Sequence, residues 1–293
     1  MTNPLEQLGQ KARAAAKLLA HASTDQKNKA LAAAAAGLKT AKADILAANA
    51  KDVEAARKSG MAEAMIDRLV LNEARLNGMI EGLETVKALP DPVGRKLESV
   101  KRPNGLVIEK DSVPIGVIGI IFEARPNVAV DAAALSIKSG NAAILRGGSD
   151  SWNSVQLLVE IIQKALETAG LPRDAVQTLP TADRALVGAL LTLDKYVDVI
   201  VPRGGKSLTG RVREESRIPV FSHLDGICHI YIDAKADAVN AVDITVNAKM
   251  RRVSVCGAAE CLLLNKSILP TIGKNVIDAV VKAGCEVRAP KEV

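Results

Sequence analysis

The stretch VPIGVIGIIFEARPN, residues 113–127, decides the fold class, because its apolar run over 115–122 is rich in β-branched residues. Such a run is typical of a strand buried on both faces of a parallel sheet. Further strands are expected in NAAILRGG (141–148), DAVQTLP (174–180) and VDVIVPRGG (197–205), with helices between them in DAAALSIKSG, SWNSVQLLVEIIQKALETAG and RALVGALLTL. This alternation predicts an α/β fold with a twisted parallel sheet and helices on its faces.

The segments on either side of this alternation have a different character. Residues 4–90 are Ala-rich with few β-branched residues, which favours helices. Residues 96–114, KLESVKRPNGLVIEKDSVP, place two β-type runs around the turn signal RPNG, and predict a hairpin that is exposed or pairs with another subunit. Near the end, a helix is expected over 237–250 and a strand in ECLLLN (260–265).

Composition narrows the class of protein. The 293 residues suffice for roughly two domains, and 48% of them are hydrophobic but only 2% aromatic, so the core must consist of Ala, Val, Ile and Leu. The net charge of +6 comes from 39 Lys and Arg against 33 Asp and Glu, spread along the chain. Without a long basic run or stacking aromatics, nucleic-acid binding is not expected, whereas anionic small substrates suit the charge.

Neither a metal site nor a membrane segment is expected. The four cysteines form no CxxC pair and there are three histidines, which argues against zinc. No apolar run reaches the ~18 residues of a membrane span. The start MTNPLEQLGQ lacks a signal-peptide core, so we expect a cytoplasmic protein with reduced thiols.

The loops that follow the predicted strands are the places to look for ligands, because parallel sheets bind them at the carboxyl ends of their strands. VPRGGKSL is not a Walker loop, since the position five residues before Gly205 is Ile200 rather than glycine. Gly204 and Gly205 would still permit close approach of a phosphate, and the alternative is a simple turn. No GxGxxG motif occurs, and whether Arg146 of RGGSD meets an adenosine 2′-phosphate stays open.

Two further loops carry candidate catalytic side chains. In FEARPN, Arg125 could grip a phosphate and Asn127 could donate to an oxyanion, or Arg125 could pair with Glu123. In AKMRRVSVCGAAECLLL (248–264), Cys256 falls between a predicted helix and a predicted strand. Nearby arginines would favour its thiolate, but a structural cysteine is the alternative. Cys261, inside the apolar run, is the better structural candidate, and the other two cysteines have no distinguishing context.

Four segments carry a resemblance to a known family: VPIGVIGIIFEARPNVAVDAAALSIKSGNAAILRGG, VIVPRGGKSL, HLDGICHIYID and NAKMRRVSVCGAAE. Together they resemble the gamma-glutamyl phosphate reductases, or glutamate-5-semialdehyde dehydrogenases, a branch of the aldehyde dehydrogenase superfamily. The resemblance covers nearly the whole chain in order. It implies an aldehyde dehydrogenase-like fold: a Rossmann-type NADP-binding domain (1–94 and 114–226), an oligomerisation hairpin (95–113) and the incomplete start of an α/β catalytic domain (227–293).

The resemblance implies an NADPH-dependent enzyme that reduces L-glutamate 5-phosphate to L-glutamate 5-semialdehyde and phosphate, the second step of proline biosynthesis. Cys256 would be the nucleophile that forms a thioester, and Asn127 would help to hold the oxyanion. His223 stands where hydrolytic relatives carry the glutamate that activates water. The implied substrate-side residues are Arg125, His223, Arg251 and Arg252, and the implied cofactor-side residues are Arg146, Gly147, Gly148, Ser149, Gly204, Gly205 and Lys206.

The resemblance also implies partners, and the chain departs from the family in two respects. A homo-oligomer is expected at full length, with channelling of substrate from glutamate 5-kinase. Val253 replaces a common proline and Gly257 a common asparagine around the cysteine. The family continues for about a hundred more residues, a domain-scale length, so the chain is expected to be truncated. A CoA-acylating aldehyde dehydrogenase and a non-catalytic fragment that binds nucleotide or a partner remain as alternatives.

Overall fold

The computed structural model describes residues 4–183, 185–222, 226–253 and 255–290. Contacts divide the chain into two compact units, Met1–Ser222 and His223–Val293. Each unit has a parallel sheet and a hydrophobic core of its own. We describe each unit by itself.

The first unit is built on a parallel sheet whose described strands run in the order β5-β4-β3-β6. These strands are β3 Val117–Phe122, β4 Ala142–Arg146, β5 Val176–Thr178 and β6 Val199–Arg203. β3 lies between β4 and β6, with Ile121 opposite Arg146 and Phe122 opposite Arg203. The buried strand and the α/β fold class expected from residues 113–127 are therefore confirmed.

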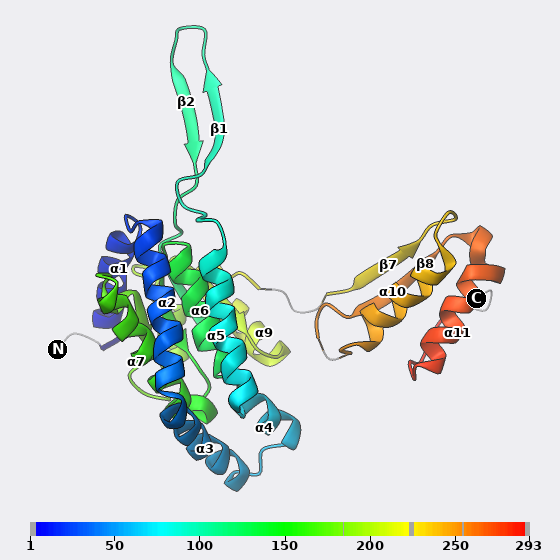
Figure 1. Ribbon diagram of the computed structural model, residues 1–293, viewed down its shortest axis with the longest axis horizontal. Helices are drawn as coiled ribbons and strands as arrows, with labels where there is room; N and C mark the ends of the chain where they lie inside the picture. The colour runs from blue at the N-terminus through cyan, green and yellow to red at the C-terminus, as the bar shows by residue number, and fades with distance from the viewer. Residues whose placement is uncertain (1–3, 184, 223–225, 254, 291–293) are drawn as a thin grey trace. The chain divides into compact units, whose positions relative to one another are not determined.

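Both faces of this sheet are covered, which explains why β3 is apolar throughout. Ile120 and Phe122 of β3 point into a core shared with α2 Thr24–Thr40, α5 Glu73–Ala88, α6 Asn127–Lys138 and α7 Trp152–Thr168 (Figure 1). Ile121 points to the opposite face, where α1 Pro4–Leu19, α8 Ala185–Leu191 and α9 Lys206–Glu215 pack. Alternate residues of a strand face opposite sides, so one apolar run supplies two cores.

The helices end where the sequence provides glycine. Gly140 and Gly170 follow α6 and α7 with φ of +72° at both positions, a conformation that is open to glycine and strained for other residues. The helix α9, which follows the RGGKS segment, is an element that the sequence analysis did not anticipate. No helix in the described part of the chain is both long enough and apolar enough to cross a bilayer.

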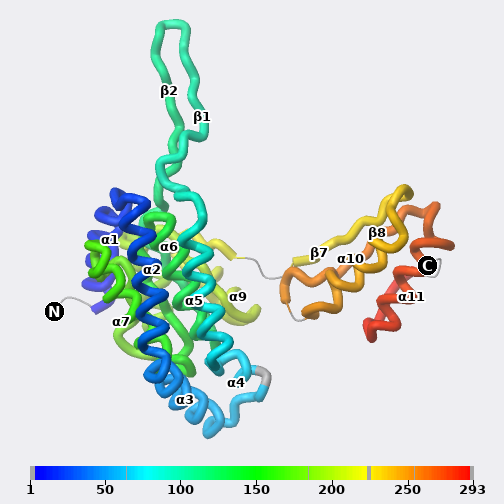
Figure 2. Tube along the Cα trace, viewed as in Figure 1, coloured from blue at the N-terminus to red at the C-terminus, as the bar shows by residue number. Residues whose placement is uncertain are grey.

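The expected hairpin is present and projects from the first unit (Figures 1 and 2). β1 Lys96–Lys101 pairs antiparallel with β2 Val107–Asp111, and Gly105 takes a positive φ of +90° in the turn. Every residue of both strands is exposed, including the apolar Leu97 and Ile108. The hairpin thus presents apolar side chains to solvent within this unit.

The described part of the second unit is a strand–helix–strand followed by a further helix. β7 Cys228–Ile232 and β8 Ala259–Leu264 pair in parallel, and the helix α10 Ala238–Met250 connects them. A 3₁₀ turn, Lys266–Ile268, and a π turn, Leu269–Gly273, lead into α11 Lys274–Lys282. Its small core contains Ile232, Ala241, Ile268, Val276 and Val280.

A buried carboxylate fixes the start of α7 in the first unit. Asp52, on α3 Lys42–Lys58, is only 3% exposed. Its Oδ1 accepts hydrogen bonds from the backbone and side-chain nitrogens of Asn153 (3.1 and 2.8 Å). Its Oδ2 accepts from the backbone nitrogen of Ser154 (2.8 Å) and from the Ser154 hydroxyl (2.6 Å). A helix that is distant in the sequence therefore caps the first turn of α7. The RGGSD loop directly precedes this turn, so the cap also fixes the end of that loop.

Replacing this cap should destabilise the first unit. Asp52→Ala leaves the buried backbone N–H of Ser154 and the part-buried N–H of Asn153 without this partner, so we expect the free energy of unfolding to fall by about 2 kcal/mol. Urea unfolding can be followed through the fluorescence of Trp152, the chain's one tryptophan, which is the first residue of α7. The matched control is Glu54→Ala, which removes an exposed ion pair with Lys58 on the same helix and should leave stability nearly unchanged. Equal effects of the two substitutions would contradict the capping role.

Candidate functional site

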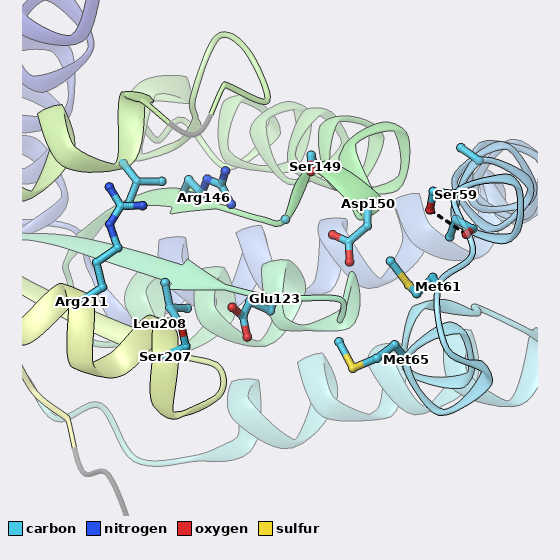
Figure 3. A pocket seen from close by; sticks show the side chains of 14 residues that line it. Ser59, Met61, Met65, Glu123, Arg146, Ser149, Asp150, Ser207, Leu208 and Arg211 are labelled. Carbon is cyan, nitrogen blue, oxygen red and sulfur yellow. Dashed lines mark hydrogen bonds between the residues drawn. The ribbon is translucent and has the colours of Figure 1, made fainter.

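The described first unit contains a cavity of about 610 Å³ at the carboxyl edge of its sheet. The chain order makes this edge a switch point, because β3, β4 and β5 follow one another to one side while β6 returns to the other side of β3. The volume is in the range of small-molecule and cofactor sites. The lining residues come from five places: Glu123 after β3, the end of β4 and the loop after it from Arg146 to Asp150, Val187 on α8, Ser207 to Arg211 on α9, and Ala55 to Met65 around the end of α3 (Figure 3).

The charged side chains of this cavity are unevenly distributed. In Figure 3, Arg146 and Arg211 lie toward one end, Met61 lies at the other, and Glu123 and Asp150 lie between. The Arg146 guanidinium donates to the Ala182 carbonyl oxygen at 3.5 Å. Arg211 donates through Nε to Glu215 at 2.7 Å. An anionic group would therefore be attracted to the arginine end, and hydroxyl groups could donate to the carboxylates.

The carboxylate groups of two flexible side chains lie close against two glycines of the predicted loops. A Cβ on Gly204 would lie 2.6 Å from Glu123 Oε2, and a Cβ on Gly148 would lie 2.0 Å from Asp150 Oδ1. Glu123 Oε2 also accepts a hydrogen bond from the backbone nitrogen of Gly205 at 3.1 Å, at the start of α9. The carboxylate thus binds the helix N-terminus at which the sequence suggested phosphate.

The turn after β3 separates its two polar side chains. Ala124 is buried and has φ of +42°, a left-handed conformation that strains a non-glycine residue. Glu123, on one side of this residue, lines the cavity. Asn127, on the other side, begins α6 and donates from Nδ2 to Asp131 at 3.1 Å. Arg125, between them, is exposed.

Cys256 lies in the second unit, in the turn between α10 and β8, as the sequence predicted. The turn is closed by hydrogen bonds from Val255 N to the Arg252 carbonyl (3.3 Å) and from Ala258 N to the Val255 carbonyl (3.1 Å). Cys256 is exposed, as are Arg251 and Arg252 before it, whereas Cys261 is half-buried in β8. The turn therefore presents the thiol to solvent on the same loop as two cations.

The structure brings most of the predicted site residues together in two groups, one in each unit, whereas Arg125 and Asn127 line neither the cavity nor the turn of Cys256. Arg146, Gly148 and Ser149 line the cavity of the first unit, Gly147 lies within the same loop, and Gly204, Gly205 and Lys206 begin the helix α9 that forms one wall. Cys256, Arg251 and Arg252 share the turn of the second unit. His223 lies outside the described residues. The described residues contain no cluster of three or more His, Cys, Asp or Glu side chains arranged to hold a metal ion.

Several cavity residues were not found from the sequence. Ser59, Met61 and Met65 lie within residues 4–90, which the sequence analysis predicted only as helices. Arg211 would have been found if a helix had been expected after RGGKS, because it lies just over one turn beyond Lys206 on the same helix. Glu123 was considered only as a partner for Arg125.

Comparisons with known proteins extend over both units. The chain matches the model of the aldehyde dehydrogenase family over residues 3–291. It is 53% identical over 285 residues to the gamma-glutamyl phosphate reductase of Rhodospirillum rubrum (97% of this chain, 67% of that protein), and 54% identical over 281 residues to that of Paramagnetospirillum magneticum (96% and 66%). The crystal structure of gamma-glutamyl phosphate reductase from Thermotoga maritima is similar with a TM-score of 0.92 and 41% identity, covering 99% of this chain and 70% of that chain. This chain spans about two thirds of the length of these curated relatives.

The cavity also holds a carboxyl group with a shifted pKa. Burial raises the pKa of Asp150 above its ordinary value, and the neighbouring carboxylates of Asp52 and Glu123 act in the same direction, against hydrogen bonds from nearby backbone N–H groups. Between the ordinary and the raised pKa, the folded protein binds more protons than the unfolded chain. Stability therefore falls as the pH rises through this window, and the ionised group weakens the fold above it.

Asp150→Asn should remove this pH dependence. We expect the variant to be more stable than the parent chain at neutral pH, because no charge is then buried. The difference should disappear in acid below the ordinary aspartate pKa, where the parent carboxyl is also neutral. Urea unfolding at a series of pH values measures both limits, and Asp194→Asn, at an exposed position, is the control. A gain that is the same at every pH would contradict the assignment to ionisation.

Proposed function

Because the chain belongs to the aldehyde dehydrogenase family, and within it to the gamma-glutamyl phosphate reductases, we propose that it provides the nucleotide site and the nucleophile for reduction of L-glutamate 5-phosphate. The products are L-glutamate 5-semialdehyde and phosphate, and the reaction is the second step of proline biosynthesis. The observation that best supports this proposal is the exposure of Cys256 in a tight turn that also carries two arginines.

Aldehyde dehydrogenases use NAD or NADP, and the cavity of the first unit suits such a cofactor. It lies at the switch point of a parallel sheet, it has a volume of about 610 Å³, and it combines two arginines with acceptors for hydroxyl groups. We assign NADPH as the preferred form because Arg146 can pair with a 2′-phosphate. The loops at 147–149 and 204–206 would hold the pyrophosphate, and contact with Gly205 N would require Glu123 to leave it. When bound, the reduced nicotinamide supplies the hydride.

The chain's own residues account for the remaining steps. The Cys256 thiolate attacks the acyl carbon of the substrate, and a tetrahedral oxyanion forms. Collapse of this species breaks the bond to the phosphate oxygen, releases phosphate and leaves a thioester on Cys256. After reduction of the thioester carbon, the thiolate departs and the semialdehyde is released. Arg251 and Arg252, on the same turn as Cys256, attract the substrate phosphate.

Asn127 is assigned to the oxyanion, and two further residues to the substrate. An asparagine side chain has two N–H donors, and the contact with Asp131 uses one, so a second remains for an oxyanion. Arg125 and His223 are assigned to binding of the substrate. The hydrogen bond to Asp131 orients the Asn127 amide, which is the requirement for preorganised stabilisation.

The exposed hairpin β1–β2 supports the proposal that copies of this chain assemble into an oligomer. Both of its strands are exposed on both faces, and Leu97 and Ile108 are 54% and 49% exposed. Apolar side chains on a projecting strand pair are typical of an interface with another chain. We propose that the hairpin joins copies of this chain into a homo-oligomer. Channelling from glutamate 5-kinase would protect the reactive acyl phosphate from water.

The central test is run in the direction of oxidation. We expect NADP⁺ reduction with glutamate semialdehyde to require inorganic phosphate, and Cys256→Ser to lower kcat by at least about 10³-fold. Cys285→Ser is the matched thiol control. Turnover that depends on coenzyme A instead of phosphate would favour the acylating alternative. Activity that persists in Cys256→Ser would contradict the nucleophile assignment. If only a protein of the relatives' full length is active, the chain by itself is a fragment.

Arg146→Ala should change cofactor preference. Loss of a charged hydrogen bond to the 2′-phosphate should raise KM for NADP⁺ by about tenfold to a hundredfold and leave KM for NAD⁺ nearly unchanged. The ratio of the two KM values is insensitive to partial unfolding, which lowers both activities equally. Arg173→Ala, at an exposed ion pair, serves as control. Equal changes for both cofactors would show that Arg146 does not contact the 2′-phosphate.

A further inference from the structure

Two cysteines that are far apart in the sequence meet in the second unit. Cys228 is the first residue of β7, and its Sγ lies 3.5 Å from the backbone carbonyl oxygen of Cys256. The contact follows from strand pairing, because Cys228 lies opposite Ala259 on β8, three residues after Cys256. Pairing of β7 with β8 therefore holds the two cysteines at the same end of the sheet.

Close backbone packing keeps the two segments together. Gly226, just before β7, lies so close to the turn that a Cβ on it would be 2.8 Å from the Cys256 carbonyl oxygen. The same Cβ would be 3.4 Å from Cys228 Sγ. Only glycine fits at this distance without a shift of the backbone. The proximity of the two cysteines is therefore part of the packing of this unit.

The two thiols differ in a way that suits an attacking and a resolving pair. Cys256 is exposed in its turn and follows two arginines, whereas Cys228 is half-buried at the start of a strand. Thiolate character and access to solvent both increase the rate at which peroxides oxidise a cysteine. Cys256 should thus react first with an oxidant, and the thiol of Cys228 should then attack the oxidised Cys256 sulfur.

We propose that Cys228 is the resolving thiol of Cys256, so that mild oxidation stores the nucleophile as a reversible Cys228–Cys256 disulfide. A disulfide requires Cα atoms within roughly 4.4–6.8 Å and side chains that face each other. Cys228 Sγ already touches the main chain of Cys256, so rotation of the Cys256 side chain with adjustment of its exposed turn brings the sulfurs together. The formation of the disulfide is independent of the proposed reduction, and only its protective value rests on that function.

Hydrogen peroxide is the oxidant, and the two steps balance. The Cys256 thiolate attacks one peroxide oxygen, an S–O bond forms, the O–O bond breaks, and the departing hydroxide is protonated to water. This oxidises Cys256 to a sulfenic acid. Cys228 then loses its proton and attacks the sulfenic sulfur. An S–S bond forms, the S–O bond breaks, and hydroxide leaves with that proton as a second water. A dithiol reductant restores both thiols and becomes a disulfide itself.

The test uses the whole chain, treated with about one equivalent of hydrogen peroxide and then with N-ethylmaleimide to block the remaining thiols. Trypsin followed by cleavage after Glu260 separates Cys256, in VSVCGAAE, from Cys261. We expect mass spectrometry to find this peptide joined to IPVFSHLDGICHIYIDAK, which contains Cys228. A sample taken before N-ethylmaleimide is added should have lost about 2 Da from the intact chain, the mass of two hydrogens, and dithiothreitol should restore it.

Matched variants make the result specific. Treated with about two or more equivalents of hydrogen peroxide, which the second oxidation step requires, Cys228→Ser and Cys228→Ala should both lack the cross-link and allow Cys256 to proceed to the sulfinic acid, a gain of about 32 Da that dithiothreitol does not reverse. Cys261→Ser and Cys285→Ser should retain the cross-link. The proposal is overturned if Cys256 of the parent chain is over-oxidised while Cys228 stays reduced, or if Cys256 pairs with Cys261 or with a second chain. A cross-link without phosphate-dependent turnover would leave this inference intact and count against the proposed function alone.

Discussion

The burial of β3 between β4 and β6 is the constraint on which the first unit depends. Each large apolar side chain that β3 buries contributes roughly 1.5–3 kcal/mol, and the side chains alternate between two separate cores. A slip of one residue would send each set to the wrong core, so the register is fixed. The fixed register aligns the ends of three strands, with Ile121 opposite Arg146 and Phe122 opposite Arg203. The loops that line the cavity are therefore positioned by the core.

At the carboxyl edge of the sheet, the backbone N–H groups at the starts of α7 and α9 donate to carboxylates of the chain itself. Asp52 binds the first turn of α7, and Glu123 binds the first N–H of α9. The positive end of a helix attracts any anion, and here the chain supplies its own. The helix N-termini alone cannot then account for binding of a phosphate-rich cofactor. In the proposed function, Arg146 and Arg211 provide attraction for such a cofactor, and Glu123, which lies on the surface, is the carboxylate that would move.

The sequence predicted those elements whose structure depends on residues within or next to the element itself. The apolar run over 115–122 and the helix-ending glycines Gly140 and Gly170 are of this kind, as is the turn that presents Cys256. Features that depend on tertiary contacts could not be predicted. Met61 follows α3 and reaches the cavity because α3 packs against α7, and no residue near Met61 in the sequence indicates a ligand site. The helix α9 was missed because its first residues were interpreted only as a phosphate loop.

Cys228 is the clearest case of information that exists only in the folded chain. Its sequence context is an ordinary strand start, and its partner lies 28 residues away. Gly226 and Gly257 flank the same corner but differ in their physical role. A Cβ on Gly226 would collide with the Cys256 carbonyl, whereas a Cβ on Gly257 would meet no described atom within 4 Å. Packing therefore demands glycine at 226 and leaves 257 free to carry a side chain. Packing therefore does not explain the glycine at 257, where the family that the chain resembles commonly carries asparagine, and the turn of Cys256 has one polar side chain fewer.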